Sequence, residues 1–319
     1  MTPGEYAQKY RKLRVYTFTD EQANAAQDGQ LPPGGHWIEV DVHRYRIAPS
    51  DEARKELSAK HVIEASEKFG QNVRPHIGTG KKPLTVWVEK VDGTLESRTY
   101  HNRMELGVNA YDAFSGKANP EEMQVTLQLA MRFGLVKGEN LSASLQSYCD
   151  NNDMGLDCNG FVGNYLRHVV FGKPWFSDPE TRKQDLTEAS ANMSIELTIR
   201  PPFAKVLTTV EEIGLNAHRA LILAKCDVNG IVRDRFGKEV GHLMIADPHS
   251  ARLTLMPELV GVADKPFLTI ALDVIESTGG LGLMNTTYHI LQPMPKNTFE
   301  ICRGSKHQKM HVKIAALMA

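Results

Sequence analysis

The stretch from Gly155 to Val170 places a cysteine, Cys158, at the start of an amphipathic helix. Beyond this cysteine the large apolar residues recur on one face of a 3.6-residue period, at Phe161, Val162, Tyr165, Leu166, Val169 and Val170. Turn-prone residues come before it, at Asn151, Asn152, Asp153 and Gly155. Asp157 or Asn159 can cap the helix start. The pattern predicts a helix of about three to four turns with Cys158 in its first turn.

This position favours a reactive thiol. Amide groups of a first helical turn and the positive end of the helix dipole stabilise a thiolate. A lone cysteine is more often a small buried apolar residue than a nucleophile. Here, however, a polar turn precedes Cys158, small residues follow it, and the apolar face begins only at Phe161. We therefore treat Cys158 as a candidate nucleophile.

The run Asp157-Cys158-Asn159-Gly160-Phe161-Val162, with Tyr148 upstream, resembles the nucleophile motif of the NlpC-like cysteine peptidases of the papain superfamily. In that family a Tyr precedes an Asp-Cys-Ser-Gly-hydrophobic-Val run. Residues 172–175, Gly-Lys-Pro-Trp, are similar to the turn that ends the first helix of the family. Asn159 departs from the usual Ser, which leaves the nucleophile itself intact.

The resemblance implies an α+β fold with a papain-like (NlpC-type) core, in which the nucleophile helix packs on an antiparallel sheet. We expect this hydrolase domain over residues 116–319, preceded by a small α+β module over residues 1–115 that could recognise a substrate or partner. The order of predicted elements, helices first and strands afterwards, is that of an α+β protein.

A cysteine hydrolase needs a base near the sulfur and a group that orients the base. Gly241-His242-Leu243-Met244-Ile245 opens a predicted strand, and it is similar to the run that carries the catalytic base in the resembling family. His242 is therefore the candidate base, with His218 and His249 in reserve. The family's third residue lies on the next strand, where Glu276 would stand; Asp247 or His249 are the alternatives.

With these parts, a Cys158 thiolate would attack an amide carbonyl and His242 would protonate the leaving amine. The amides of the helix start, with Tyr148, Asp157 or Asn159 near them, would bind the oxyanion or the substrate. The resemblance implies a peptide or peptidoglycan-fragment substrate, such as bacterial cell-wall peptide. Two alternatives stay open: acyl transfer or deamidation by the same residues, and a non-enzymatic binding protein in which Cys158 is inert.

Local patterns predict further elements. A strand is expected over residues 36–42, a helix over 51–68 capped by Ser50 and stopped by Gly70, and a hairpin over 84–100 turned at Asp92-Gly93. Helices are also expected from Asn119 to about Phe133 and over residues 140–148. Residues 177–198 read as irregular or partly helical. Later β-prone runs cover residues 220–224, 241–246, 267–276 and 288–291, and Lys306, His307, Lys309, His311 and Lys313 read as a solvated basic tail.

The formal net charge of −1 excludes a global electrostatic drive toward nucleic acid or an anionic membrane. The four cysteines show no C-x-x-C pairing, which predicts free thiols of a reducing compartment. No apolar run has the length of a signal peptide or membrane span. We therefore expect a soluble chain made in the cytosol, which could leave it only by a non-classical route or by lysis. The sequence suggests no metal or cofactor and leaves the oligomeric state open.

Overall fold

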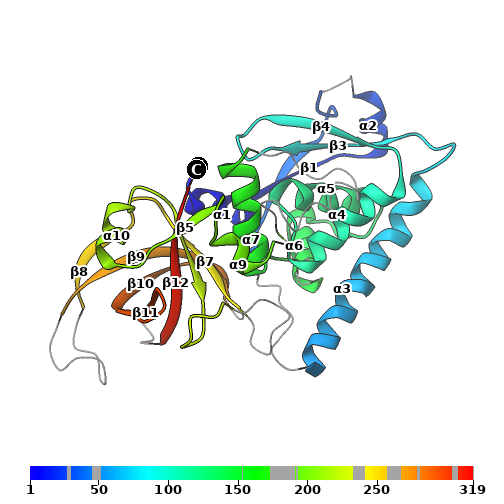
Figure 1. Cartoon of the computed structure of the whole chain (residues 1–319). Helices are drawn as coiled ribbons and strands as arrows, with labels where there is room; N and C mark the ends of the chain where they lie inside the picture. Colours follow the sequence, from blue (N-terminus) through cyan, green and yellow to red (C-terminus); the bar gives the residue numbers. More distant parts are fainter. Residues whose placement is uncertain are drawn as a thin grey trace.

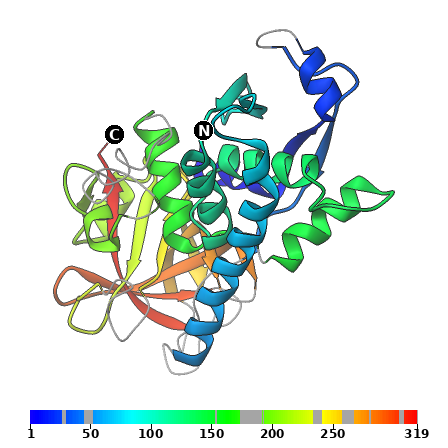
Figure 2. The same ribbon diagram turned by 90° about the vertical axis from the view of Figure 1, so that its right-hand side faces the viewer.

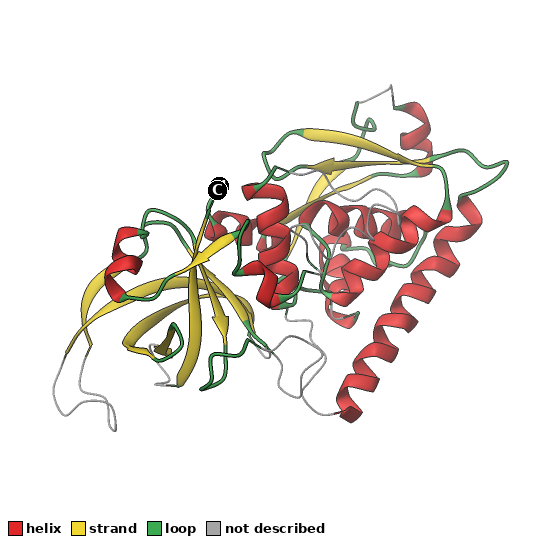
Figure 3. Cartoon of the chain, in the orientation of Figure 1, coloured by secondary structure: helices red, strands yellow, loops and turns green. Residues whose placement is uncertain are grey.

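A computed structural model describes residues 1–26, 30–44, 52–152, 154–172, 191, 193–232, 241–256, 267–278, 281–303 and 308–318. Figure 1 shows two lobes with helix α7 between them, and Figure 2 gives the view at a right angle. The strands gather mainly in one lobe and the longer helices in the other (Figure 3).

The helices of the described residues are α1 (Pro3–Arg11), α2 (Asp20–Ala25), α3 (Glu52–Val73), α4 (Arg103–Ser115), α5 (Pro120–Arg132), α6 (Leu141–Asn151), α7 (Cys158–Tyr165), α9 (Ile195–Thr198) and α10 (Val210–Leu215), with a 3₁₀ turn η1 (Arg74–His76) and a π-helical segment η2 (Leu166–Val170). The strands are β1 (Leu13–Thr17), β2 (His36–Val40), β3 (Leu84–Glu89), β4 (Leu95–Tyr100), β5 (Ala204–Val206), β6 (Leu221–Lys225), β7 (Leu243–Ala246), β8 (Arg252–Met256), β9 (Phe267–Thr278), β10 (Gly282–Met294), β11 (Thr298–Arg303) and β12 (Lys309–Leu317).

The strand-rich lobe is a closed antiparallel barrel. Among the described strands, six form the ring in the order β10-β11-β12-β6-β7-β9, and β9 pairs back onto β10; β5 and β8 add to its rim. Side chains of a strand alternate between its two faces. One alternate set fills the barrel interior: Leu221, Leu223, Met244, Ala246, Ile270, Leu272, Val274, Tyr288, Ile290, Phe299, Ile301, Val312, Ile314 and Ala316. The other set faces outward and meets α7.

The prediction of a papain-like fold, with a helix packed on an open sheet, was wrong because the sheet closes into this barrel. Closure comes from the long β9–β10 pairing, which runs in register from Gly282 opposite Thr278 to Ile290 opposite Ile270. It also requires β12, which joins β11 to β6.

The prediction of a solvated C-terminal tail was wrong as well. Residues 309–317 form β12, whose Val312, Ile314 and Ala316 are buried in the barrel interior. Lys309, His311 and Lys313 therefore belong to a strand, while Lys306 and His307 lie outside the described residues.

The other lobe has its own apolar core. The predicted strand near residue 36 and the hairpin over residues 84–100 are confirmed as β2 and as β3–β4. Helices α3, α4, α5 and α6 pack with these strands around one cluster of buried residues that extends from Leu13 to Met154. One core thus joins residues on both sides of residue 115. The strands predicted after residue 220 are also present, as β6, β7, β9 and β10.

The predicted helix at Asn119 is confirmed as α5, which begins with a capping box of Asn119 and Glu122. The helix predicted to stop at Gly70 continues to Val73, so Gly70 lies inside α3. Its predicted cap, Ser50, and its first residue, Asp51, lie outside the described residues, as do residues 173–175 and 177–190. The helix at Cys158 is confirmed as α7, extended by η2.

A row of polar side chains on α5 covers the free edge of β3. Gln124 both accepts from the Glu89 amide and donates to the Glu89 carbonyl, each at 2.8 Å. Gln128 repeats this pair of hydrogen bonds at Trp87, accepting from its amide at 3.1 Å and donating to its carbonyl. Arg132 donates to the Thr85 carbonyl at 3.2 Å. Because helix positions four apart match strand positions two apart, one side of α5 takes the place of a neighbouring strand.

We expect Gln128→Ala to lower the free energy of unfolding by about 1–3 kcal/mol, because it leaves the buried main-chain groups of Trp87 without partners. Urea unfolding of the variant and the parent measures this difference. Gln71→Ala is the control, since Gln71 is exposed on α3 and should change stability by less than about 0.5 kcal/mol. Equal stability of Gln128→Ala and the parent would show that the row does not stabilise the fold.

Candidate active site

The nucleophile candidate begins α7. Asp157 is the N-cap, and its carboxylate accepts the amide of Gly160. The ammonium group of Lys117 lies 2.6 Å from the other oxygen of this carboxylate. Cys158 follows as the first helical residue and is 4% exposed. Lys117 therefore balances the negative charge that the cap would otherwise place next to the thiol.

Main-chain contacts fix the segment that leads into α7. The amide of Leu156 donates to the Arg44 carbonyl at 2.8 Å, and the Leu156 carbonyl accepts from the Ser277 hydroxyl at 2.7 Å. A Cβ on Gly155 would lie 2.0 Å from the Arg44 oxygen, so this close approach requires glycine. The position of Cys158 is thus fixed both by Arg44, next to the helix-rich lobe, and by strand β9.

Packing of both faces holds α7 in place. Phe161 and Tyr165 contact Tyr6 of α1, with ring centroids 5.8 and 5.7 Å apart. The same apolar cluster includes the outward-facing Leu243 and Ile275 of the barrel. Helix α1 is tied in turn to the barrel, because the amide of Gly4 donates to the Asp247 carboxylate at 2.8 Å.

The barrel brings His242 to Glu276. Strand β7 pairs with β9 so that Met244 lies opposite Glu276. His242, two residues before Met244, projects to the same face as Met244 and is the diagonal neighbour of Glu276. Its Nε2 lies 3.0 Å from Glu276 Oε2.

The carboxylate of Glu276 is 1% exposed and has two further partners inside the barrel. The Tyr288 hydroxyl donates to its oxygens at 3.0 and 3.1 Å, and Arg303 Nη2 lies 3.0 Å from Oε1. Burial alone would raise the pKa of Glu276. The hydrogen bond and charge of His242, together with Arg303 and Tyr288, outweigh burial and lower this pKa. Glu276 is therefore held as a carboxylate.

The thiol of Cys158 lies close enough to His242 to act on the pKa of the ring, both as a hydrogen-bond partner and through its charge. Since Nε2 is held by Glu276, the nitrogen left for the sulfur is Nδ1. Burial disfavours the charged ring, but hydrogen bonds to Cys158 and Glu276 and the negative charges of both outweigh it and raise the pKa of His242 to about 9. At neutral pH the ring is therefore protonated, between a sulfur and a carboxylate.

The structure thus brings three of the sequence-predicted residues together: Cys158, His242 and Glu276. The alternatives for the third residue have other surroundings. Asp247 binds the first turn of α1, and His249 is exposed in a turn with a φ of 60°. The reserve base His218 is also exposed, beside Arg219.

The residues predicted to bind the oxyanion or the substrate lie in two different places. Asp157 caps α7, and the Asn159 side chain donates to the Met193 carbonyl at 2.6 Å, so both lie at the helix start. Tyr148 instead packs against the core of the helix-rich lobe, whereas Cys158 belongs to the apolar cluster between α7 and the outer face of the barrel.

Three residues of the site escaped the sequence analysis: Lys117, Tyr288 and Arg303. Lys117 precedes the cap of α5 and reaches Asp157 across 40 residues of chain. Tyr288 and Arg303 share a register position on β10 and β11. A tyrosine in a β-prone run and a single arginine carry no local signal of their partner, since that partner is set by strand pairing.

Among the described residues, no group of three or more His, Cys, Asp or Glu side chains is placed to hold a metal ion. Within the same residues, no helix has the length and apolar character needed to cross a membrane. Comparison of the chain with models of known protein families, with curated proteins and with solved structures finds no match. Inferences about its chemistry must therefore come from the geometry of Cys158, His242 and Glu276.

We expect the His242 ring to titrate near pH 9 and its pKa to fall in Cys158→Ala and in Glu276→Gln, because each change removes a hydrogen bond and a negative charge from the protonated ring. NMR titration of the imidazole protons measures the pKa in each variant. His218→Ala, an exposed histidine, is the control and should leave the titration of His242 unchanged. A parent pKa near 6.5 would contradict the arrangement.

Proposed function

We propose that the protein is a cysteine-dependent hydrolase that cleaves an amide or peptide bond, with Cys158 as nucleophile, His242 as base and acid, and Glu276 as the group that orients His242. The observation that carries the proposal is the place of the His242 ring, between the thiol at a helix start and a buried, ionised carboxylate. This is the nucleophile–base–orienter arrangement of acyl-transfer enzymes.

In the first half-reaction the proton of Cys158 resides on His242, and the thiolate adds to the carbonyl carbon of the substrate. The carbon–nitrogen bond of the resulting tetrahedral species then breaks. The leaving nitrogen takes the proton from His242, and the acyl group stays on the sulfur as a thioester.

In the second half-reaction His242 removes a proton from water while the water oxygen adds to the thioester carbon. The carbon–sulfur bond breaks, the acid is released, and the proton returns to the Cys158–His242 pair. Glu276 accepts from Nε2 throughout, which keeps Nδ1 directed at the reacting atoms.

Main-chain amides at the start of α7 suit the developing oxyanion. The Gly160 amide is bound by Asp157, so, within the part of the chain that the structure describes, the amides of Cys158 and Asn159 are those left at the helix start. The Asn159 side chain is held by the Met193 carbonyl, which fixes the first turn without using these amides.

The likeness of residues 148–162 to the NlpC-like nucleophile motif favours a peptide of the bacterial cell wall as substrate, although Tyr148 packs in the first lobe. The same thioester would also serve acyl transfer to an amine, or deamidation if a glutamine side chain supplied the carbonyl. Hydrolysis is the simplest outcome, because it needs no second substrate besides water.

The thiolate absorbance near 240 nm, measured against pH in the parent and in Cys158→Ser, tests the first requirement without a reagent having to reach the thiol. We expect the part of this absorbance that Cys158→Ser removes to change its pH dependence in His242→Ala, because the proposed pair shares one proton. The other thiols serve as internal controls, since burial raises the pKa of Cys149 to about 12 and that of Cys226 to about 11. Ionisation that does not depend on His242 would refute the proposed pair.

Turnover is tested with peptidoglycan fragments and a mixed peptide library, analysed by mass spectrometry. We expect Cys158→Ala to abolish cleavage and Glu276→Gln to lower kcat by about 10-fold or more, since the loss of an orienting group misplaces the base. Addition of glycinamide separates the alternatives, because transfer yields a new amide and hydrolysis yields the acid. If none of these substrates yields a product, the result would favour the alternative of a non-enzymatic binding protein.

A further inference from the structure

Strand β2 has an open edge. It pairs with β1 on one side, from Thr17 opposite His36 to Leu13 opposite Val40. In an antiparallel strand the amide and carbonyl of one residue point to the same side, and this side alternates along the chain. Just beyond β2, Asp41 directs both groups away from β1, toward Gln146 of α6, at 2.9 and 3.0 Å. By alternation Trp37 and Glu39 direct their main-chain groups the same way.

This edge differs from that of β3 in one respect. Three successive side chains of α5 cover the β3 edge, as described above, whereas one side chain of α6 covers the β2 edge, at Asp41. One turn before Gln146, α6 carries Ser142, and four residues earlier stands Gly138. Both are too short to continue the row. Within the described part of the chain, no group bonds to the main chain of Trp37 or Glu39 on this side.

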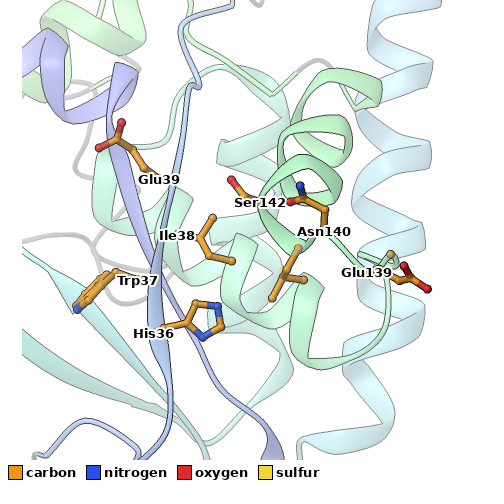
Figure 4. A pocket seen from close by; sticks show the side chains of 9 residues that line it. His36, Trp37, Ile38, Glu39, Glu139, Asn140 and Ser142 are labelled. Carbon is orange, nitrogen blue, oxygen red and sulfur yellow. The ribbon is translucent and has the colours of Figure 1, made fainter.

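A cavity of about 970 Å³ lies beside β2, before the point where Gln146 of α6 covers its edge. Residues 36–39 form one wall and residues 138–142 form the other (Figure 4). His36 and Ile38 extend toward α6, whereas the Trp37 ring points away (Figure 4) and stacks with Tyr16 at 5.1 Å. The cavity thus presents main-chain groups at its edge and side chains of alternate residues in its wall.

We propose that this cavity binds an extended peptide, which adds a strand to the open edge of β2 and carries a basic side chain. Main-chain hydrogen bonds from Trp37 and Glu39 would supply the pairing, as in other cases where a peptide extends a sheet. The cavity wall offers the half-buried Leu141 to an apolar side chain of the peptide.

The negative charge of the residues around the cavity favours a peptide with a basic side chain. Two exposed glutamates border the cavity: Glu39 extends to the same side of β2 as Trp37, away from α6 (Figure 4), where a side chain of an added strand would lie beside it, and Glu139 precedes α6. None of the nine lining residues is Lys or Arg. The nearest guanidinium on β1, that of Arg14, is already bound to Glu89 at 2.7 Å and lies over the Trp37 ring. A lysine or arginine of the peptide that lies beside Glu39 would therefore meet an exposed carboxylate.

The site is distinct from the thiol and needs no catalysis. Strand β2 leads through Val42 and His43 to Arg44, whose carbonyl holds Leu156 next to the nucleophile segment. A peptide on β2 would thus lie on the lobe that precedes Cys158, and its binding is measured without any reaction at that residue.

The test uses ¹⁵N-labelled protein and the pentapeptide acetyl-Lys-Val-Thr-Val-Lys-amide. We expect saturable shifts confined to β2 and the start of α6, with slower hydrogen exchange of the Trp37 and Glu39 amides in the complex. The same peptide with Glu in place of both Lys should bind at least 10-fold more weakly. No saturation at millimolar peptide, or shifts centred elsewhere, would overturn the proposal.

Two N-methylated peptides test the main-chain pairing. One carries N-methyl groups on both valines and the other on Lys, Thr and Lys, so that each blocks a different edge of the peptide strand. Strand addition requires that one of them lose at least 10-fold in affinity while the other binds like the parent peptide. Equal binding of both would exclude pairing with β2.

Variants of the protein complete the test. Ser142→Gln places a longer side chain in the cavity and should weaken peptide binding at least 10-fold. Glu39→Pro removes one unpaired donor at the open edge, where proline is tolerated, and should weaken binding similarly. Ser147→Gln, an exposed position on the same helix, is the matched control and should bind as the parent does. Unchanged binding in both test variants would place the peptide elsewhere.

Discussion

The carboxylate of Glu276 sets the strictest requirement on this fold. A buried charge is tolerated only when it is paired and hydrogen-bonded, and Glu276 meets this condition through three strands at once: β7 by way of His242, β10 by way of Tyr288 and β11 by way of Arg303. These strands can surround one point only because β9 closes onto β10. The barrel and the candidate site are therefore one arrangement, and an open sheet would lose a donor to Glu276.

Much of the candidate site could be predicted from sequence because its parts carry local signals. Cys158 follows a polar turn and begins an amphipathic helix, and His242 opens a strand after glycine. Glu276 needed only the assumption that its strand follows that of His242, and β9 does lie beside β7. Lys117, Tyr288 and Arg303 could not be found in this way, since each meets its partner through contacts that join distant parts of the chain.

The fold was harder to predict than the site for the same reason. Closure depends on β12, where Lys309, His311 and Lys313 suggest a solvated end because they alternate with the apolar residues of its first part. Helix α5 poses a related difficulty. Its glutamines read as a solvent-facing side, yet Gln124 and Gln128 are buried against β3. Hydropathy cannot distinguish an amide that faces water from one that replaces a strand.

Helix α1 has an architectural consequence. Its tyrosines pack on the nucleophile helix, and its first turn binds Asp247, the residue that follows the strand of the candidate base. A single short element thus spans both halves of the site, although it supplies no reacting group. The distance between the Cys158 sulfur and the His242 imidazole therefore depends on α1 as well as on α7 and the barrel. A fluctuation that loosens α1 would displace the thiol and the imidazole together.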